Sequence, residues 1–241
     1  MQRAEQLHRQ VCEEFGLLAE EVFRYRVEVS SDGLQHRYYA VHPPMSFDHF
    51  SLLVGDCLHN LRSSLDHLAW QLVRCDGATP SRRTAFPTEK AEGAIIEPRV
   101  SSVVMERIGQ LFSGDSLWPD FASQVKDLHE LDIWDKHRLL VVVSAVADIA
   151  HMRHTADHEE WLEPPPRVRF ADRDVVHGAH VLTVIYESPV HGDGPDIKPI
   201  AQLRIGPGPR GAGRPVAAFL GELLQMVQYV TALFKDQFTQ T

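Results

Sequence analysis

Hydrophobic residues recur at intervals of three and four positions in several long stretches of the chain, which is the pattern of amphipathic helices. Pro43-Pro44 breaks the chain before the second of these stretches, and Ser46 and Asp48 are candidates for its N-cap. We therefore predict helices over residues 4–23, 46–74, 101–112 and 216–234.

A further helical pattern starts after Pro119, at Phe121, and continues through FASQVKDLHELDIWDKHRLLVVVSAV to Val146. The end of this stretch, LLVVVSAV, is rich in β-branched residues, and periodicity alone does not separate a buried strand from a buried helix there. We favour a helix over the whole stretch.

Strand-like patterns occupy two other parts of the chain. The sequence YRVEVSSDGLQHRYYAV places β-rich residues on both sides of Asp32-Gly33, a dipeptide that closes hairpins. After Pro164-Pro165-Pro166, the short runs VRF, HVLTVIYE and IAQLRIG are separated by Gly, Pro and Asp. We predict an N-terminal β-hairpin and a three- or four-stranded antiparallel sheet near the C-terminus.

These elements predict an α+β fold, mainly a helical bundle with the hairpin and the small sheet attached. The length of 241 residues suits one domain with an elaboration. We expect a single domain over residues 1–241, with a β-rich insertion at residues 160–208 before the final helix.

Composition favours a globular protein and argues against non-specific nucleic-acid-binding, secreted and membrane proteins. The chain is 44% hydrophobic and 24% charged, as in globular proteins, and its net charge of −9 argues against a broad basic surface for nucleic acid. The N-terminus lacks an apolar signal segment, no unbroken run of about 18 apolar residues occurs, and the three cysteines leave one unpaired. We expect a cytoplasmic protein without membrane contact.

The second predicted helix carries an unusual polar side in GDCLHNLRSSLDHLAWQL. Its leucines fall within an arc of about 80° that must face the core; they are Leu58, Leu61, Leu65, Leu68 and Leu72. The polar residues form two neighbouring groups: His59, Arg62 and Asp66, then Asp56, Asn60 and His67. Solvated helix faces usually consist of Lys and Glu, so a face of Asp, Asn and His suggests another role.

The helix predicted over residues 121–146 has a second polar cluster, in LHELDIWDKHRLL. Asp132 and Asp135 share a stripe with Leu128, which directs both carboxylates toward packing. A buried carboxylate needs a cationic or hydrogen-bonding partner. Candidates are His59, Arg62 and His67 on the other helix, with Lys136, His137 and Arg138 nearby. A purely structural network between the two helices is an equally simple interpretation.

The two patterns GDxxHNLRSxLDHLxW and LxxLDxWDKHRLL resemble a widespread set of uncharacterised bacterial proteins. Members of this set share a Phe-Pro between the two motifs, here Phe86-Pro87. The resemblance covers residues 47–140 and does not specify an activity.

The segment from Arg62 to His67 also resembles the HEPN superfamily, helical bundles in which an R-x4-6-H motif cuts RNA without a metal. Asn60 lies shortly before the motif, and Ser63 stands where the family typically has Asn, Asp or His. The resemblance implies His67 as general acid or base, Arg62 as phosphate clamp and Asn60 as an assisting polar residue. RNA supplies its own 2′-hydroxyl nucleophile, so these groups would suffice.

The resemblance therefore implies a metal-independent endoribonuclease, a toxin or defence component that needs no cofactor, binds RNA as substrate and pairs as a homodimer. The supporting polar network would consist of His59, Asp66, Asp132, Asp135, Lys136, His137 and Arg138. The alternative is a non-catalytic helical binding or interaction module in which the same His/Arg/Asp network is buried.

Other chemistry has weaker support in the sequence. His151, His154 and His158 have metal-like spacing but lack HExxH or a fixed third ligand, so we assign no metal site. No nucleotide-binding glycine motif or GxSxG is present, and Ser63-Ser64 lie inside a predicted helix, which disfavours a serine hydrolase.

Overall fold

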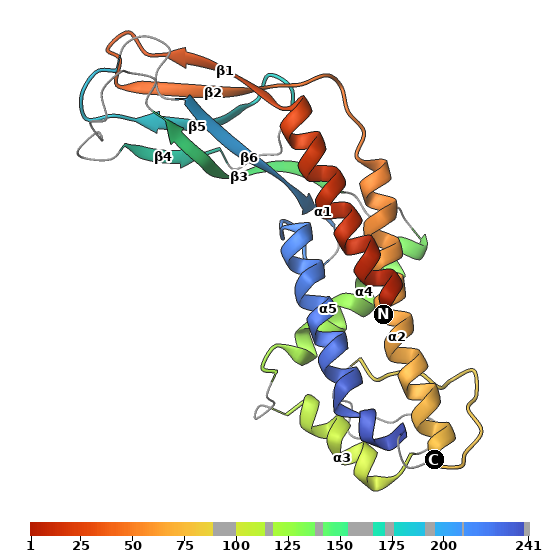
Figure 1. The fold of residues 1–241 in the computed structure, drawn as a ribbon. Helices are drawn as coiled ribbons and strands as arrows, with labels where there is room; N and C mark the ends of the chain where they lie inside the picture. Colours follow the sequence, from red (N-terminus) through yellow and green to blue (C-terminus); the bar gives the residue numbers. More distant parts are fainter. Residues whose placement is uncertain are drawn as a thin grey trace. The chain divides into compact units, whose positions relative to one another are not determined.

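The computed structural model describes residues 1–88, 100–113, 118–137, 142–153, 166–171, 176–190, 196–208 and 210–238, with only the backbone at 137, 144–153 and 196–200. The fold is α+β, as predicted (Figure 1). The helices are α1 Gln2–Val22, α2 Asp48–Cys75, α3 Ser102–Leu111, α4 Phe121–His137, α5 Val216–Leu233 and a 3-10 turn, Lys235–Phe238. The strands are β1 Arg24–Val29, β2 Gln35–Val41, β3 Val142–Arg153, β4 Arg167–Phe170, β5 His180–Ile185 and β6 Asp196–Ile205.

The chain divides into two compact units, each assembled from separate segments. The helical unit consists of Met1–Val11, Asp48–Val141 and Ile205–Thr241, and the sheet unit of Cys12–Phe47 and Val142–Arg204. Compactness does not decide whether the units fold independently, so one domain over residues 1–241 stays a prediction.

The helical unit is built around α2, which packs against both α4 and α5 (Figure 1). The predicted leucine arc of α2 is buried, from Leu58 to Leu72. The first turns of α1 join this core, where Cys57 Sγ donates to the carbonyl of Ala4 over 3.5 Å and His8 Nε2 bonds the carbonyl of Ala217 over 2.9 Å.

Helix α5 is the most apolar helix of the helical unit. In the described part of the chain, it alone is long and apolar enough to cross a membrane, a test that core helices also pass. Its buried residues are Val216, Phe219, Leu220, Leu223, Leu224, Met226, Val227 and Val230. The cytoplasmic location expected from the sequence stays a prediction.

Ion pairs attach the loop before α5 to α4. The carboxylate of Asp127, on α4, lies 3.3 Å from Arg210 Nε and 3.8 Å from Arg214 Nη1, and Arg214 also pairs with Glu222 on α5. Burial raises the pKa of Asp127, and the two arginines oppose that shift. The GPGPRGAGRP tract, whose composition is that of a flexible loop, thus contributes cations to the helical unit.

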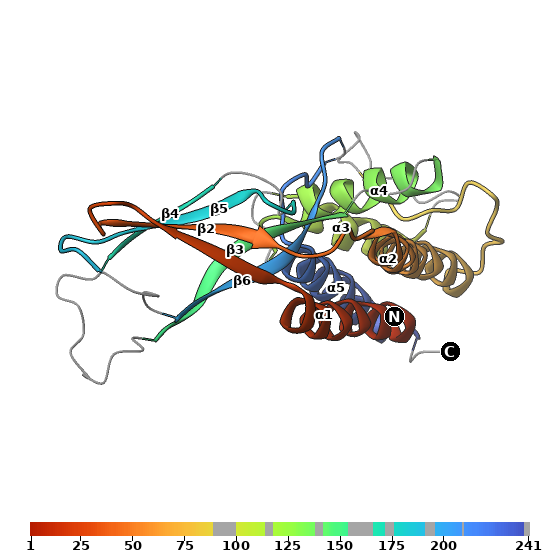
Figure 2. The same ribbon diagram turned by 90° about the horizontal axis from the view of Figure 1, so that it is seen from above.

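The sheet unit contains a four-stranded sheet in the order β1-β2-β5-β4 (Figure 1), and β2, β4 and β5 are labelled again in the second view (Figure 2). The predicted hairpin is confirmed: β1 and β2 pair antiparallel from Arg24 opposite Val41 to Val29 opposite His36, and Gly33 adopts φ +67°. Strand β5 pairs antiparallel with both β2 and β4. The N-terminal hairpin and part of the predicted C-terminal sheet therefore form one sheet.

The predicted helix over residues 121–146 is wrong at its C-terminal end. Helix α4 ends at His137, and Val142 begins β3, which pairs with β6 in a second, two-stranded sheet. Val142 and Val143 are β-branched, which favours an extended backbone when another strand is available for pairing. Local periodicity could not reveal that partner, because β6 starts more than fifty residues later.

Candidate functional site: the polar network between α2 and α4

Arg62 is the buried centre of a set of hydrogen bonds whose carboxylate partner, Asp66, has a side chain that is 37% exposed. The residue is 5% exposed, and its Nη2 donates to Asp66 Oδ1 over 2.6 Å and to the carbonyl oxygen of Phe86 over 2.8 Å. The backbone N–H of Phe86 donates to the same Asp66 Oδ1 over 2.9 Å. We call Arg62, Asp66 and the backbone of Phe86 the Arg62 clamp.

The clamp fixes the position of the Phe86 side chain. That ring is buried and meets the ring of Phe121, at the start of α4, edge to face with 6.4 Å between centroids. The Phe-Pro between the two sequence motifs thus supplies backbone groups to one motif helix and an aromatic contact to the other.

Burial dominates the electrostatics of Arg62. It lowers the pKa of the guanidinium, and the nearby carboxylates of Asp66 and Asp132 oppose that shift. Nη1 is buried and has no hydrogen-bond partner among the described residues. The charged group therefore faces the protein on every side.

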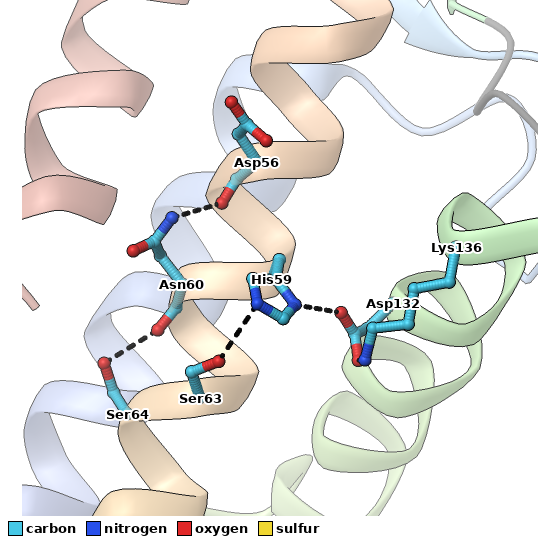
Figure 3. A network of polar contacts seen from close by, with 7 residues as sticks. All are labelled: Asp56, His59, Asn60, Ser63, Ser64, Asp132 and Lys136. Atoms are coloured by element: carbon cyan, nitrogen blue, oxygen red, sulfur yellow. Dashed lines mark hydrogen bonds and ion pairs between the residues drawn. The ribbon is translucent and has the colours of Figure 1, made fainter.

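Asp132 is the second centre of the network, and it is 3% exposed, as the helical pattern predicted. Its Oδ1 lies 3.0 Å from His59 Nδ1, on α2, and its Oδ2 accepts from Lys136 Nζ over 2.6 Å (Figure 3). Both carboxylate oxygens are thus engaged by donors, one on each motif helix. The contact of His59 with Asp132 joins the two polar clusters, whereas Arg62 bonds Asp66 and the carbonyl of Phe86, and Lys136 lies on the same helix as Asp132.

The carboxylate of Asp135 rests against Gly55 of α2. A Cβ added to Gly55 would lie 2.3 Å from Asp135 Oδ2 and 2.5 Å from Oδ1 and Cγ. A side chain at residue 55 would require the Asp135 carboxylate to move, so the glycine at the start of the first motif is coupled to an aspartate of the second motif.

Asn60 and His67 lie outside these contacts. The Asn60 side chain donates within its own helix, to the carbonyl of Asp56 over 2.7 Å (Figure 3), and His67 is exposed. Arg62 and His67 are five residues apart on a continuous helix, so their side chains leave the axis about 140° apart. Within one chain, the three predicted catalytic residues therefore do not converge on one point.

Sequence reasoning missed two members of the site. His129, on α4, has a buried Nδ1 without a hydrogen-bond partner in the described structure. Burial lowers its pKa, and the charge of Arg62 acts in the same direction. Ser63, which was predicted to lie in a helix without a chemical role, places its Oγ 3.4 Å from His59 Nε2. The i,i+4 spacing of Ser63 from His59 was the available signal for this contact.

Several predicted residues are outside the description. Arg138, His154 and His158 are not among the described residues, and the side chains of His137 and His151 are likewise not described. Among the residues that are described, no group of three or more His, Cys, Asp or Glu could hold a metal ion.

Comparison of the chain with protein-family models, curated proteins and solved structures finds no match. The function of the chain is therefore inferred from the geometry of the polar network.

Proposed function

We propose that the helical unit is an interaction module whose motif helices are held in register by the Arg62 clamp. The observation that carries the proposal is the burial of Arg62, which is 5% exposed and donates to Asp66 and Phe86 within the chain. Pairing a buried guanidinium with a carboxylate and a carbonyl offsets the free energy that its desolvation costs. A clamp of this kind favours one packing of α2 against α4 and the 84–87 segment.

The same contacts count against Arg62 as a phosphate clamp. A guanidinium that binds RNA phosphate must reach the solvent, and here it would first have to leave Asp66 and the carbonyl of Phe86. Metal-independent RNA cleavage by a homodimer, as implied by the HEPN resemblance, stays a prediction without support from this geometry.

The surface available to a partner is the side of α2 opposite its leucines. Residues accessible there include Leu52, Asp56, His67, Trp70 and Arg74. This side combines one apolar, one aromatic and several polar groups, a composition that suits a protein contact as well as a nucleic acid. An RNA or a second copy of the chain remains the partner predicted from the resemblance.

The experiment compares Arg62→Ala, Arg62→Lys and His67→Ala with the parent protein. We expect Arg62→Ala to lower the free energy of unfolding by roughly 1.5–3 kcal/mol, because it removes hydrogen bonds to a charged buried group. His67→Ala, at an exposed position, should change stability by less than about 0.5 kcal/mol. Denaturant titration measures both values.

RNA breakdown is measured on the same purified proteins. The module proposal predicts no cleavage that depends on either residue. It is overturned if the parent protein cuts RNA and both Arg62→Lys and His67→Ala abolish cutting while they stay folded.

A further inference from the structure

Three side chains of the helical unit form a chain of hydrogen bonds from α2 to α4: Ser63, His59 and Asp132. Ser63 Oγ lies 3.4 Å from His59 Nε2, and His59 Nδ1 lies 3.0 Å from Asp132 Oδ1 (Figure 3). We propose that Ser63 is a nucleophile activated by His59, with Asp132 orienting the imidazole, and that it accepts acyl groups from activated esters.

The hydrogen-bond partners of His59 define how its neutral ring can act. The Asp132 carboxylate can only accept, so Nδ1 carries the hydrogen of this bond. Nε2 of the neutral imidazole then keeps its lone pair and faces the Ser63 hydroxyl, which can donate to it. A nucleophile next to a base that a third group orients is the arrangement used in covalent catalysis.

Exposure increases from the orienting carboxylate to the base, and Ser63 is half-buried. The Asp132 side chain is 4% exposed, whereas that of His59 is 54% exposed. Lys136 Nζ holds the second oxygen of Asp132 over 2.6 Å, so the carboxylate has a fixed direction. The Nε2 end of His59 and the Ser63 hydroxyl are thus the accessible part of the series.

The neighbouring Ser64 lacks this arrangement and serves as the matched control. The hydroxyl of Ser64 donates to the carbonyl of Asn60 over 2.8 Å and accepts from the amino group of Met1 over 3.1 Å. Ser63 differs from this control in its contact with His59.

The chemistry is an ester hydrolysis in two steps. Ser63 Oγ bonds to the carbonyl carbon while its proton moves to His59 Nε2, and the carbon–oxygen bond to the leaving group then breaks as that group takes the proton. Water, deprotonated by His59, attacks the acyl-serine and releases the carboxylic acid and the serine hydroxyl. The net reaction converts ester and water to acid and alcohol.

The position of Ser63 restricts the substrate class. Backbone N–H groups in the middle of α2 donate within the helix, so they cannot form an oxyanion hole. Without that stabilisation, only esters with good leaving groups, such as p-nitrophenyl acetate, should react at a measurable rate, and amides should not.

Esterase chemistry at Ser63 goes beyond the proposed module, because it uses other atoms than the Arg62 clamp. Hydrolysis at Ser63 can fail while the stability results at Arg62 stand, and the reverse also holds.

The test measures p-nitrophenyl acetate hydrolysis and covalent labelling by a fluorophosphonate, in which Ser63 Oγ displaces fluoride from phosphorus. We expect Ser63→Ala to abolish labelling at this site and His59→Gln to slow both reactions roughly 100-fold, the effect of losing a general base. Asp132→Asn should slow both reactions, whereas Ser64→Ala should match the parent protein. Peptide mapping should place the label on Ser63.

A second readout separates catalysis from folding. The thermal midpoint of His59→Gln should stay close to the parent value while its labelling rate falls roughly 100-fold. The proposal is overturned if His59→Gln labels Ser63 at the parent rate, if Ser64 carries the label, or if hydrolysis persists in Ser63→Ala.

Discussion

At the scale of single residues, the fit between Gly55 and Asp135 illustrates how one motif constrains the other. The carboxylate occupies the space where a side-chain carbon of residue 55 would be, 2.3 Å from the nearest oxygen. Glycine in mid-helix costs stability relative to alanine on an open surface, by about 0.5–1 kcal/mol. The close approach of Asp135 opposes that preference at this position, because an added methyl group would have to displace the carboxylate.

Gly55→Ala should therefore destabilise the helical unit by about 1–3 kcal/mol, as overpacking does in other buried sites. Gly109→Ala is the control, because nothing lies within 4 Å of a Cβ added there. Denaturant unfolding measures both variants. The double variant Gly55→Ala/Asp135→Ala should recover part of the loss; a Gly55→Ala variant as stable as the parent protein would contradict the contact.

At the scale of elements, the Arg62 clamp attaches the 84–87 segment to α2 through backbone groups. The N–H of Phe86 and its carbonyl bond Asp66 and Arg62, both in one helix and one turn apart. Backbone groups of a buried segment without regular structure need such partners. The segment is thus positioned by side chains of α2 and by the Phe86 ring against α4.

Hydrogen exchange of the Asp66→Ala variant should test whether Asp66 holds the 84–87 segment against α2. The Phe86 amide loses its acceptor, so its exchange should accelerate relative to the parent protein, together with that of its neighbours in the segment. Asp56→Ala changes an exposed aspartate of the same helix and should leave the Phe86 amide protected. Exchange measured by NMR or mass spectrometry would refute the clamp if Phe86 remains equally protected in Asp66→Ala.

The structure of β3 depends on a strand that is distant in the sequence. The apolar residues from Val142 onward satisfy a helical pattern and a strand pattern equally well, and pairing with β6 favours the strand. Element types were predictable where the pattern was unambiguous, as in α1, α2, α5 and the hairpin. They were not predictable where a distant partner determined the outcome.

At the scale of the whole molecule, His129 connects the network to the pH dependence of stability. Burial lowers the pKa of His129, and the Arg62 charge adds to that effect. As the pH falls below the ordinary histidine range near about 6.5, the unfolded chain binds the proton before the folded chain does. Folding stability is then lost progressively until the folded protein also protonates His129.

His129→Gln should flatten the pH dependence of stability in this window, because glutamine does not titrate. Thermal midpoints measured between about pH 8 and about pH 5, with pH values chosen to bracket that range, test the effect. His67→Gln, at an exposed position on α2, is the control. A parent-like profile in His129→Gln would show that another group is responsible.

Local spacing and turn chemistry were enough to predict the periodic helices, the hairpin at Asp32-Gly33, the α+β class and the inward direction of Asp132. Spacing could not predict that β5 joins the hairpin, that Val142–Arg153 forms a strand, or that Arg62 is buried against Asp66 and Phe86 while His67 is exposed. The physical reason is that strand pairing and desolvation depend on groups far away in the chain, whereas helix and turn propensities depend on neighbours.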